Sequence, residues 1–163
     1  MKRSASLLAH FRDILLLPVM VTVIIPYFIG KPENQPSGYL QFAGLVLGVA
    51  GLSLFLFTVI LFKLIGRGIL APWSAKQRLV VIGPYRYCRN PMITGVFLIL
   101  FGESVFFWSS ALLSYAFIFF VINTIYFLLV EEPGLQERFG SDYDAYKVNV
   151  PRWFPRLRPY HHL

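Results

Sequence analysis

The feature that most constrains this chain is an apolar run from Tyr39 to Phe62 that contains no charged residue. An α-helix needs about 20 apolar residues to cross the ~30 Å hydrocarbon core of a bilayer, and this run is long enough. The composition agrees, since 56% of the 163 residues are hydrophobic and only 14% are charged. A soluble domain of this length needs many more charged residues to cover its surface. The sequence therefore predicts an integral membrane protein.

Hydropathy along the chain predicts a single all-α membrane domain, residues 1–163, with about four transmembrane helices. They are expected at 11–29, 39–64, 91–107 and 110–131. The last two form a helical hairpin, because only a few residues around Ser109 separate them. A cleaved signal peptide is the alternative for the first segment, but no small-x-small cleavage site follows it.

The basic residues predict how these helices are oriented. Fourteen of the fifteen Lys and Arg residues fall on one side of the predicted spans, and only Lys31 falls on the other. By the positive-inside rule, both termini are cytoplasmic. The segments 66–90 and 131–158, which are expected to form a cofactor pocket, then face the cytoplasm too. The net charge of +7 does not indicate nucleic-acid binding, because the basic residues form no basic face or known motif.

Metal chemistry has little support in the sequence. The three histidines, His10, His161 and His162, lie near the ends of the chain and form no ligand set. Cys88 is the only cysteine, so an intrachain disulfide or a cysteine metal cluster is impossible. An inert packing role is preferred for Cys88 over a reactive thiol. We expect no metal site.

The densest polar chemistry lies between Gly83 and Gly95, at the mouth of a predicted span. Asn90 followed by Pro91 predicts an N-cap and a helix that starts at about Pro91. The free N–H groups and the positive dipole end of that helix would lie beside Arg86 and Arg89. This stretch predicts a site for a carboxylate or a phosphate.

The hairpin predicts which distant residues join this site. If it closes near Ser109, Glu131 falls level with Tyr87, so Glu131 and Glu132 return to the start of the 91–107 helix. Arg89 is the candidate catalytic residue, since its guanidinium can orient an anionic substrate. It can instead pair with one of the two glutamates.

Other residues inside the predicted spans are candidates for substrate binding or packing. Glu103 is ionisable and lies within a span, which makes it a functional candidate by default. It can also lie near the far interface, with Tyr115 at equal depth. Asn123 is a candidate substrate contact, although a hydrogen bond between helices is the preferred reading. The repeat of Gly44, Gly48 and Gly51 forms a smooth helix face that predicts close packing within the bundle, with a dimer interface as the alternative.

The stretch from Gly83 to Gly95 resembles the G-x-Y-x-x-x-R-H-P-x-Y-x-G signature of the isoprenylcysteine carboxyl methyltransferase and phospholipid methyltransferase superfamily. The C-terminal half continues the resemblance through Glu131-Glu132-Pro133-Gly134-Leu135 and Val150-Pro151-Arg152-Trp153-Phe154-Pro155. It covers roughly Gly66 to Arg156. Bacterial members often carry Asn where Asn90 replaces the eukaryotic His, so the resemblance implies a bacterial inner membrane.

The resemblance implies a methyl transfer from S-adenosyl-L-methionine to a hydrophobic small-molecule or lipid acceptor in the bilayer. The positions that match its cofactor pocket are Leu79, Val80, Tyr85, Asn90, Pro91, Met92, Ile93 and Glu131. Ile93 replaces the usual Tyr of that pocket. Two alternatives are an NADPH-dependent membrane reductase of related architecture and a non-enzymatic membrane subunit.

One departure from the family concerns the acceptor. Phe127 stands where eukaryotic isoprenylcysteine methyltransferases carry an arginine that contacts the substrate carboxylate. A phenyl ring offers apolar area in place of a multidentate partner for a carboxylate. We therefore include Phe127 among the substrate contacts and expect an acceptor other than prenylcysteine.

Overall fold

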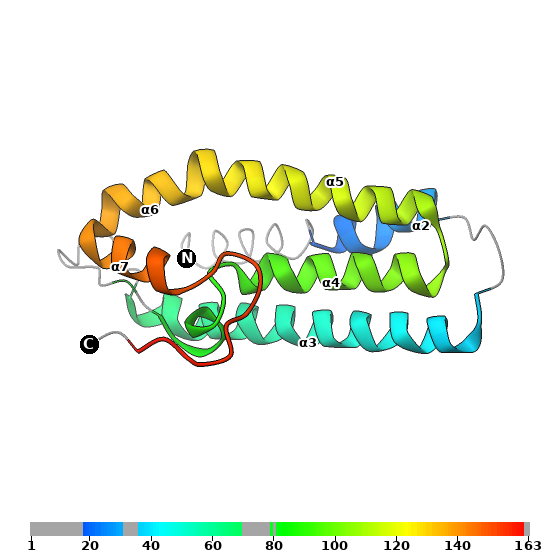
Figure 1. Ribbon diagram of the computed structural model, residues 1–163, viewed down its shortest axis with the longest axis horizontal. Coiled ribbons are helices and arrows are strands. Elements are labelled where there is room, and N and C mark those ends of the chain that lie inside the picture. Colours follow the sequence, from blue (N-terminus) through cyan, green and yellow to red (C-terminus); the bar gives the residue numbers. More distant parts are fainter. Residues whose placement is uncertain (1–17, 31–35, 70–78, 80, 162–163) are drawn as a thin grey trace, which may run out of the picture.

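The computed structural model describes residues 18–30, 36–69, 79 and 81–161, with the side chains of 62–69 excepted. Within these ranges every regular element is a helix and there is no strand, which confirms the predicted all-α class. Figure 1 shows long helices side by side, with the short helices near the C-terminus and the irregular segments around them gathered at one end. The elements in order are η1 (Met20–Ile24), α2 (Ile25–Ile29), α3 (Gly38–Ile69), η2 (Gly83–Arg86), α4 (Pro91–Phe106), α5 (Ser110–Tyr126), η3 (Phe127–Glu131), α6 (Glu132–Phe139) and α7 (Ser141–Asn149).

Two helical segments are long and apolar enough to cross a membrane, namely Gly38–Leu61 and Ser110–Phe139. Only 22% and 6% of their apolar windows are buried inside the molecule, whereas the core helix of a soluble protein is mostly buried. Such broad exposed apolar surface is what a lipid-facing helix requires. The shorter apolar helices Met20–Ile29 and Pro91–Phe106 supply the other two predicted segments, and a count of four spans stays a prediction.

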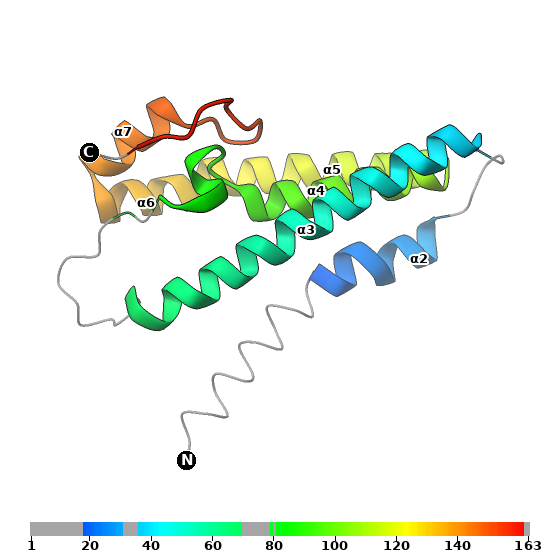
Figure 2. The same ribbon diagram turned by 90° about the horizontal axis from the view of Figure 1, so that it is seen from below.

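The helix α4 lies between α3 and α5, and glycines bring its backbone into contact with α3 (Figure 2). A Cβ atom built at Gly51 would lie 2.6 Å from the carbonyl oxygen of Gly95, and one at Gly44 would lie 2.7 Å from that of Gly102. Real Cβ contacts are essentially never this short, so only glycine permits the approach. The predicted packing of this glycine face within the bundle is confirmed.

The hairpin between α4 and α5 closes where the sequence predicts. Ser109 is the N-cap of α5, and its hydroxyl accepts a hydrogen bond from the amide of Leu112 at 3.5 Å. Phe97 and Phe120 lie at nearly equal depth in the predicted register, and their ring centroids are 5.1 Å apart. Below them, the core consists of Phe55, Val96, Leu100 and Ala116.

Two prolines lie inside continuous helical stretches, and each follows a π turn. A proline lacks the N–H group, and its ring clashes with the carbonyl four residues earlier, so a regular α-helix does not continue through it. The π-helix η1 ends two residues before Pro26, and η3 ends two residues before Pro133. The wider π turn accommodates the backbone hydrogen bond that the proline cannot form. As a result α5, η3 and α6 form one long helix with a bend (Figure 1).

Several helix ends differ from the predicted boundaries. The helix α3 continues to Ile69 rather than 64, because glycines near its end weaken a helix by only about 1 kcal/mol each. The last long helix continues beyond Glu131 to Phe139, where Gly140 stops it with a left-handed φ of 54°. Residues 11–17 of the predicted first span lie outside the described residues, and the helix that follows ends at Ile29, as predicted.

Candidate functional site

A buried ion-pair network joins the start of α4 to the start of α6. Glu132 is 5% exposed, and its Oε1 atom accepts hydrogen bonds from Arg89 at 2.9 Å and from Arg152 at 2.6 Å. The Nζ of Lys147 lies 3.2 Å from its other oxygen, and Arg89 also donates to the hydroxyl of Tyr143 at 3.3 Å. The hairpin therefore brings Arg89 to the glutamate pair, as the predicted register requires. Of the two roles considered for Arg89, pairing with Glu132 is the one observed.

The neighbouring Glu131 has a different environment. It is the last residue of η3, is half-buried, and has no hydrogen-bond or ion-pair partner within the described part of the chain. A π turn contains one residue more than an α turn, so it rotates the following residues around the helix. Consecutive residues of a helix point in different directions, and the π turn before them sets which one faces Arg89, so only Glu132 enters the network.

The helix α4 starts at Pro91 as predicted, but it lacks the predicted cap. Asn90 occupies the N-cap position, and its side chain forms no capping hydrogen bond. Its backbone carbonyl accepts from the amide and the hydroxyl of Thr94, both at 3.0 Å. The amides of Met92 and Ile93 therefore have no acceptor among the described residues, and they remain available to an anion.

The end of the chain crosses the mouth of the bundle and pairs with the residues before α4. We call residues 151–160 the C-terminal strap. It is held by four backbone hydrogen bonds of 2.9–3.3 Å, from the amides of Arg89, Asn90, Arg156 and Tyr160 to the carbonyls of Pro151, Arg152, Tyr87 and Arg86. The Nε of Arg86 donates to the carbonyl of Tyr160 at 2.8 Å, so this guanidinium binds the strap.

Trp153 of the strap packs against the α5–η3 helix. Its ring centroid lies 5.1 Å from that of Phe120 and 5.7 Å from that of Phe127, the latter edge to face. These distances are typical of favourable aromatic pairs. The Nε1 of Trp153 and the Nε of Arg89 are buried donors with no acceptor among the residues that the structure describes. Buried donors without partners are rare, so the site has unused hydrogen-bonding capacity beside Phe127.

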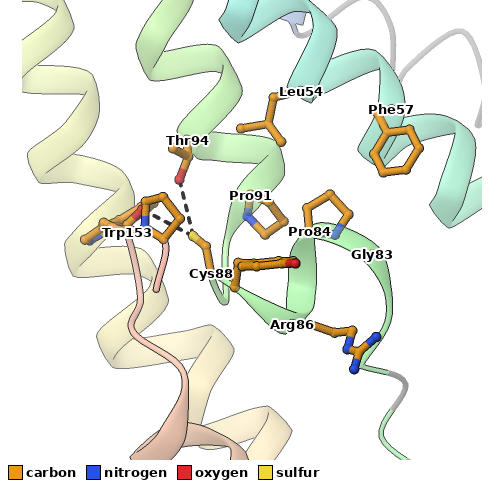
Figure 3. Close-up of a pocket in the computed structure, with 11 residues that line it drawn as sticks. Leu54, Phe57, Gly83, Pro84, Arg86, Cys88, Pro91, Thr94 and Trp153 are labelled. Atoms are coloured by element: carbon orange, nitrogen blue, oxygen red, sulfur yellow. Dashed lines mark hydrogen bonds between the residues drawn. The ribbon is translucent and has the colours of Figure 1, made fainter. Parts of the chain in front are cut away.

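A pocket of about 550 Å³ lies between the strap and α3 (Figure 3). Leu54 and Phe57 of α3 line one side, and Cys88, Thr94 and Trp153 line the other. Its volume lies in the range of small-molecule sites. Phe57 is 52% exposed on the apolar outer surface of α3, so the pocket borders the surface that faces lipid in a membrane.

Cys88 is a packing residue beneath the strap. Its side chain is 4% exposed, and its thiol donates to the carbonyls of Arg152 at 3.1 Å and Trp153 at 3.3 Å. Burial raises the pKa of the Cys88 thiol, so the reactive thiolate is disfavoured. Burial also raises the pKa of Tyr146, whose hydroxyl donates to the Tyr85 carbonyl at 2.6 Å. This environment agrees with the packing role preferred for Cys88.

The comparison with protein families adds to this geometry. The model of the phospholipid methyltransferase family matches residues 40–142, which is more than half of the chain. The chain belongs to the phospholipid methyltransferase family. No curated protein is significantly similar to it. Family membership indicates a membrane methyltransferase and gives no support to the reductase alternative.

The strap lies outside the residues that the family model matches. The match runs from α3 into the start of α7 and includes the start of α4 and both glutamates, but it ends before Arg152 and Trp153. Arg152 and Trp153, which contact Glu132, Phe120 and Phe127, therefore lie outside the matched range. The sequence placed residues 131–158 at the predicted cofactor pocket, but it did not predict the backbone pairing of the strap with the residues before α4.

The remaining predicted site residues lie in several places. Of the predicted cofactor contacts, only Pro91 lines the pocket. Leu79 packs against the cluster of Tyr143, Tyr146 and Val150, and Val80 lies outside the described residues. Met92 packs against the core of the bundle.

The predicted substrate contacts within the spans lie apart from one another. Glu103 is one turn from the end of α4, about 18 Å along the helix from Pro91. Its Oε2 is buried without a described partner, and the Tyr115 hydroxyl donates to Val21 instead, at 3.2 Å. The Asn123 amide donates to the carbonyl of Phe119 in its own helix at 2.8 Å, so the preferred bond to another helix is not observed.

Proposed function

We propose that this protein transfers the methyl group of S-adenosyl-L-methionine to a hydrophobic small-molecule or lipid acceptor in the membrane. The observation that carries the proposal is the arrangement at one end of the bundle. There, in a chain of the phospholipid methyltransferase family, the hairpin brings the uncapped start of α4 to a glutamate pair. Within the described part of the chain, only Glu132 of this pair has a partner. The other member, Glu131, is the one that the resemblance assigns to the cofactor.

The residues present complement the two charged groups of the methionine moiety of this cofactor. The carboxylate of Glu131, which has no partner among the described residues, suits its cationic amino group, and the amides of Met92 and Ile93 at the start of α4 suit its carboxylate. Tyr85, Asn90 and Pro91 would frame the same mouth, with Leu79 beside it, and the resemblance assigns Val80 to the same pocket. When bound, S-adenosyl-L-methionine supplies an already activated methyl group on its sulfonium. The protein then has to orient the acceptor and exclude water.

The acceptor is proposed to reach the site sideways from the bilayer. The pocket beside Phe57 is mostly apolar and suits a lipid chain. Arg89 keeps a candidate catalytic role through its unpaired Nε, which can donate to an oxygen of the acceptor. Phe127 and Asn123 on the α5 side, and Glu103 deeper in the bundle, are proposed contacts for the acceptor. Because of its depth, Glu103 can be reached only by a long acceptor.

Two measurements on the purified protein in detergent test this function. Calorimetry should show binding of S-adenosyl-L-methionine that is tighter than binding of NADPH. Label from the methyl group should then appear in extracted native lipids more than in a farnesylcysteine analogue. Tighter binding of NADPH would favour a reductase, and binding of neither compound by folded protein would favour a non-enzymatic subunit. Efficient transfer to the farnesylcysteine analogue alone would restore prenylcysteine as the substrate.

A further inference from the structure

The C-terminal strap has an inner face that the molecule itself occupies. Trp153 packs between Phe120 and Phe127, and the backbone bonds described above tie the strap to the residues before α4. Phe127 lies only four residues before Glu131, where the apolar run of this helix ends. The strap is therefore fixed at the depth of the last apolar turn, which is where a bilayer changes from hydrocarbon to head groups.

The outer face of the strap is exposed. Phe154 is 81% exposed and Leu157 is 99% exposed, although both are large apolar residues. Arg158 follows Leu157 and is exposed, and residues 151–160 contain no Asp or Glu. The other two arginines of the strap bind within the molecule, since Arg152 pairs with Glu132 and Arg156 donates to the carbonyl of Asn149 at 2.7 Å. Apolar side chains mixed with arginines are the composition of segments that bind the surface of an anionic membrane.

We propose that the outer face of the strap docks on the anionic lipid head groups of the membrane that holds the protein, and that this contact keeps the strap closed. Phe154 and Leu157 enter the interface, and Arg158 binds lipid phosphates. The charges are complementary, and the inner contacts already hold the face at the correct depth. This docking requires a membrane but does not depend on methyl transfer.

Cys88 provides a reporter of strap closure, since it is the only cysteine of the chain. It is buried beneath the strap and donates to two strap carbonyls. Opening of the strap removes both acceptors and exposes the thiol. The rate at which iodoacetamide alkylates Cys88 therefore measures how often the strap is open.

The experiment compares the full chain in nanodiscs of phosphatidylcholine with nanodiscs that also contain phosphatidylglycerol. We expect alkylation of Cys88 to be about tenfold slower with the anionic lipid, a factor in keeping with one or two arginines at an anionic surface. High salt should remove most of this protection, because it screens the attraction. Equal rates in the two kinds of nanodisc would overturn the proposal.

A double variant, Phe154→Ser with Leu157→Ser, separates docking from local pH at the charged surface. It keeps every arginine but should lose most of the protection by anionic lipid, while its rate in phosphatidylcholine stays that of the wild type. The matched control is Val148→Ser, which changes an exposed apolar residue of α7 outside the strap and should keep full protection. Unchanged protection in the double variant would refute docking through these side chains.

Two further outcomes also decide against the proposal. Faster alkylation of the double variant in both lipids would show that Phe154 and Leu157 hold the strap from within. Slowing of the wild type by inorganic phosphate in phosphatidylcholine nanodiscs would assign the arginines to a soluble anion. A further variant, Arg158→Gln, tests the arginine directly. It should reduce the protection of Cys88 several-fold, and only in the anionic nanodiscs.

Discussion

Two adjacent glutamates at the mouth of the bundle have different environments. Glu132 is buried and meets three cations, whereas Glu131 has no described partner. The sequence predicted that both glutamates return to Arg89, because the hairpin register depends only on where the turn lies. It did not predict which of the two glutamates pairs with Arg89, because that depends on the π turn before them.

The network predicts a large effect of Glu132→Gln on stability. Glutamine keeps the size of the side chain but leaves Arg89, 10% exposed, and Arg152, 21% exposed, without a counter-charge. Breaking such a buried pair should lower stability by about 3 kcal/mol, while the half-exposed Lys147 adds little. The measurement is the apparent melting temperature in detergent. Glu137→Gln, on the exposed side of α6, is the control and should melt like the wild type.

Glu131→Gln should leave stability almost unchanged and weaken binding of S-adenosyl-L-methionine. Loss of a hydrogen bond to a charged group costs about 1.5–3 kcal/mol, which raises Kd roughly 10-fold to 150-fold. Calorimetry on the variant and on Glu137→Gln checks this expectation. An unchanged Kd would remove Glu131 from the cofactor site.

Among the elements, the helices that contain prolines show what periodicity cannot predict. Apolar spacing located α4 and α5 closely, because both are bounded by clear signals at Pro91 and Ser109. It did not show that the last helix continues through Pro133 to Phe139. In this chain both Pro26 and Pro133 follow a π turn, which the apolar spacing does not reveal.

The contact between α3 and α4 predicts opposite outcomes for two neighbouring glycines. Gly51→Ala places a Cβ atom 2.6 Å from the backbone oxygen of Gly95 and 2.8 Å from the amide nitrogen of Ile99, neither of which can yield locally. Overpacking of this kind costs about 1–3 kcal/mol. Gly48→Ala meets no atom within 4 Å and should keep stability or raise it by up to about 1 kcal/mol, because alanine favours a helix more than glycine does. Equal melting temperatures for the two variants would contradict this packing.

At the scale of the whole molecule, the site combines parts that the sequence related to one another with a part that it did not. The hairpin predicted the meeting of Arg89 with the glutamate pair, and the family resemblance anticipated the match to the phospholipid methyltransferase family. The strap was expected near the site, as part of residues 131–158, but its pairing with the residues before α4 was not predictable in the same way. It is held mainly by backbone hydrogen bonds and by Trp153, and backbone bonds leave no pattern in the order of side chains.

The arrangement of the helices also bears on the topology of the chain in the membrane. Two helices are long enough to cross by themselves, and α4 runs between them for most of its length (Figures 1 and 2). With 16 residues, α4 is only about 24 Å long, so it crosses only where the bilayer thins around it. Its close backbone contacts with α3, from Gly44 to Phe55, nevertheless require the two helices to share the same depth.

We therefore expect four spans, with both termini and the site in the cytoplasm. Reporter fusions after residues near Gly38, Arg78 and the C-terminus should score outside, inside and inside. The expectation rests on the bias of fourteen basic residues to one, and on the packing of α4 between two candidate spans. Introducing several lysines into the segment around Gly38 should weaken the preference for this orientation, because the positive-inside rule acts through loops of this length. A C-terminus that scores outside would contradict the topology, since Arg89, Glu131 and the strap would then face away from the compartment that supplies S-adenosyl-L-methionine.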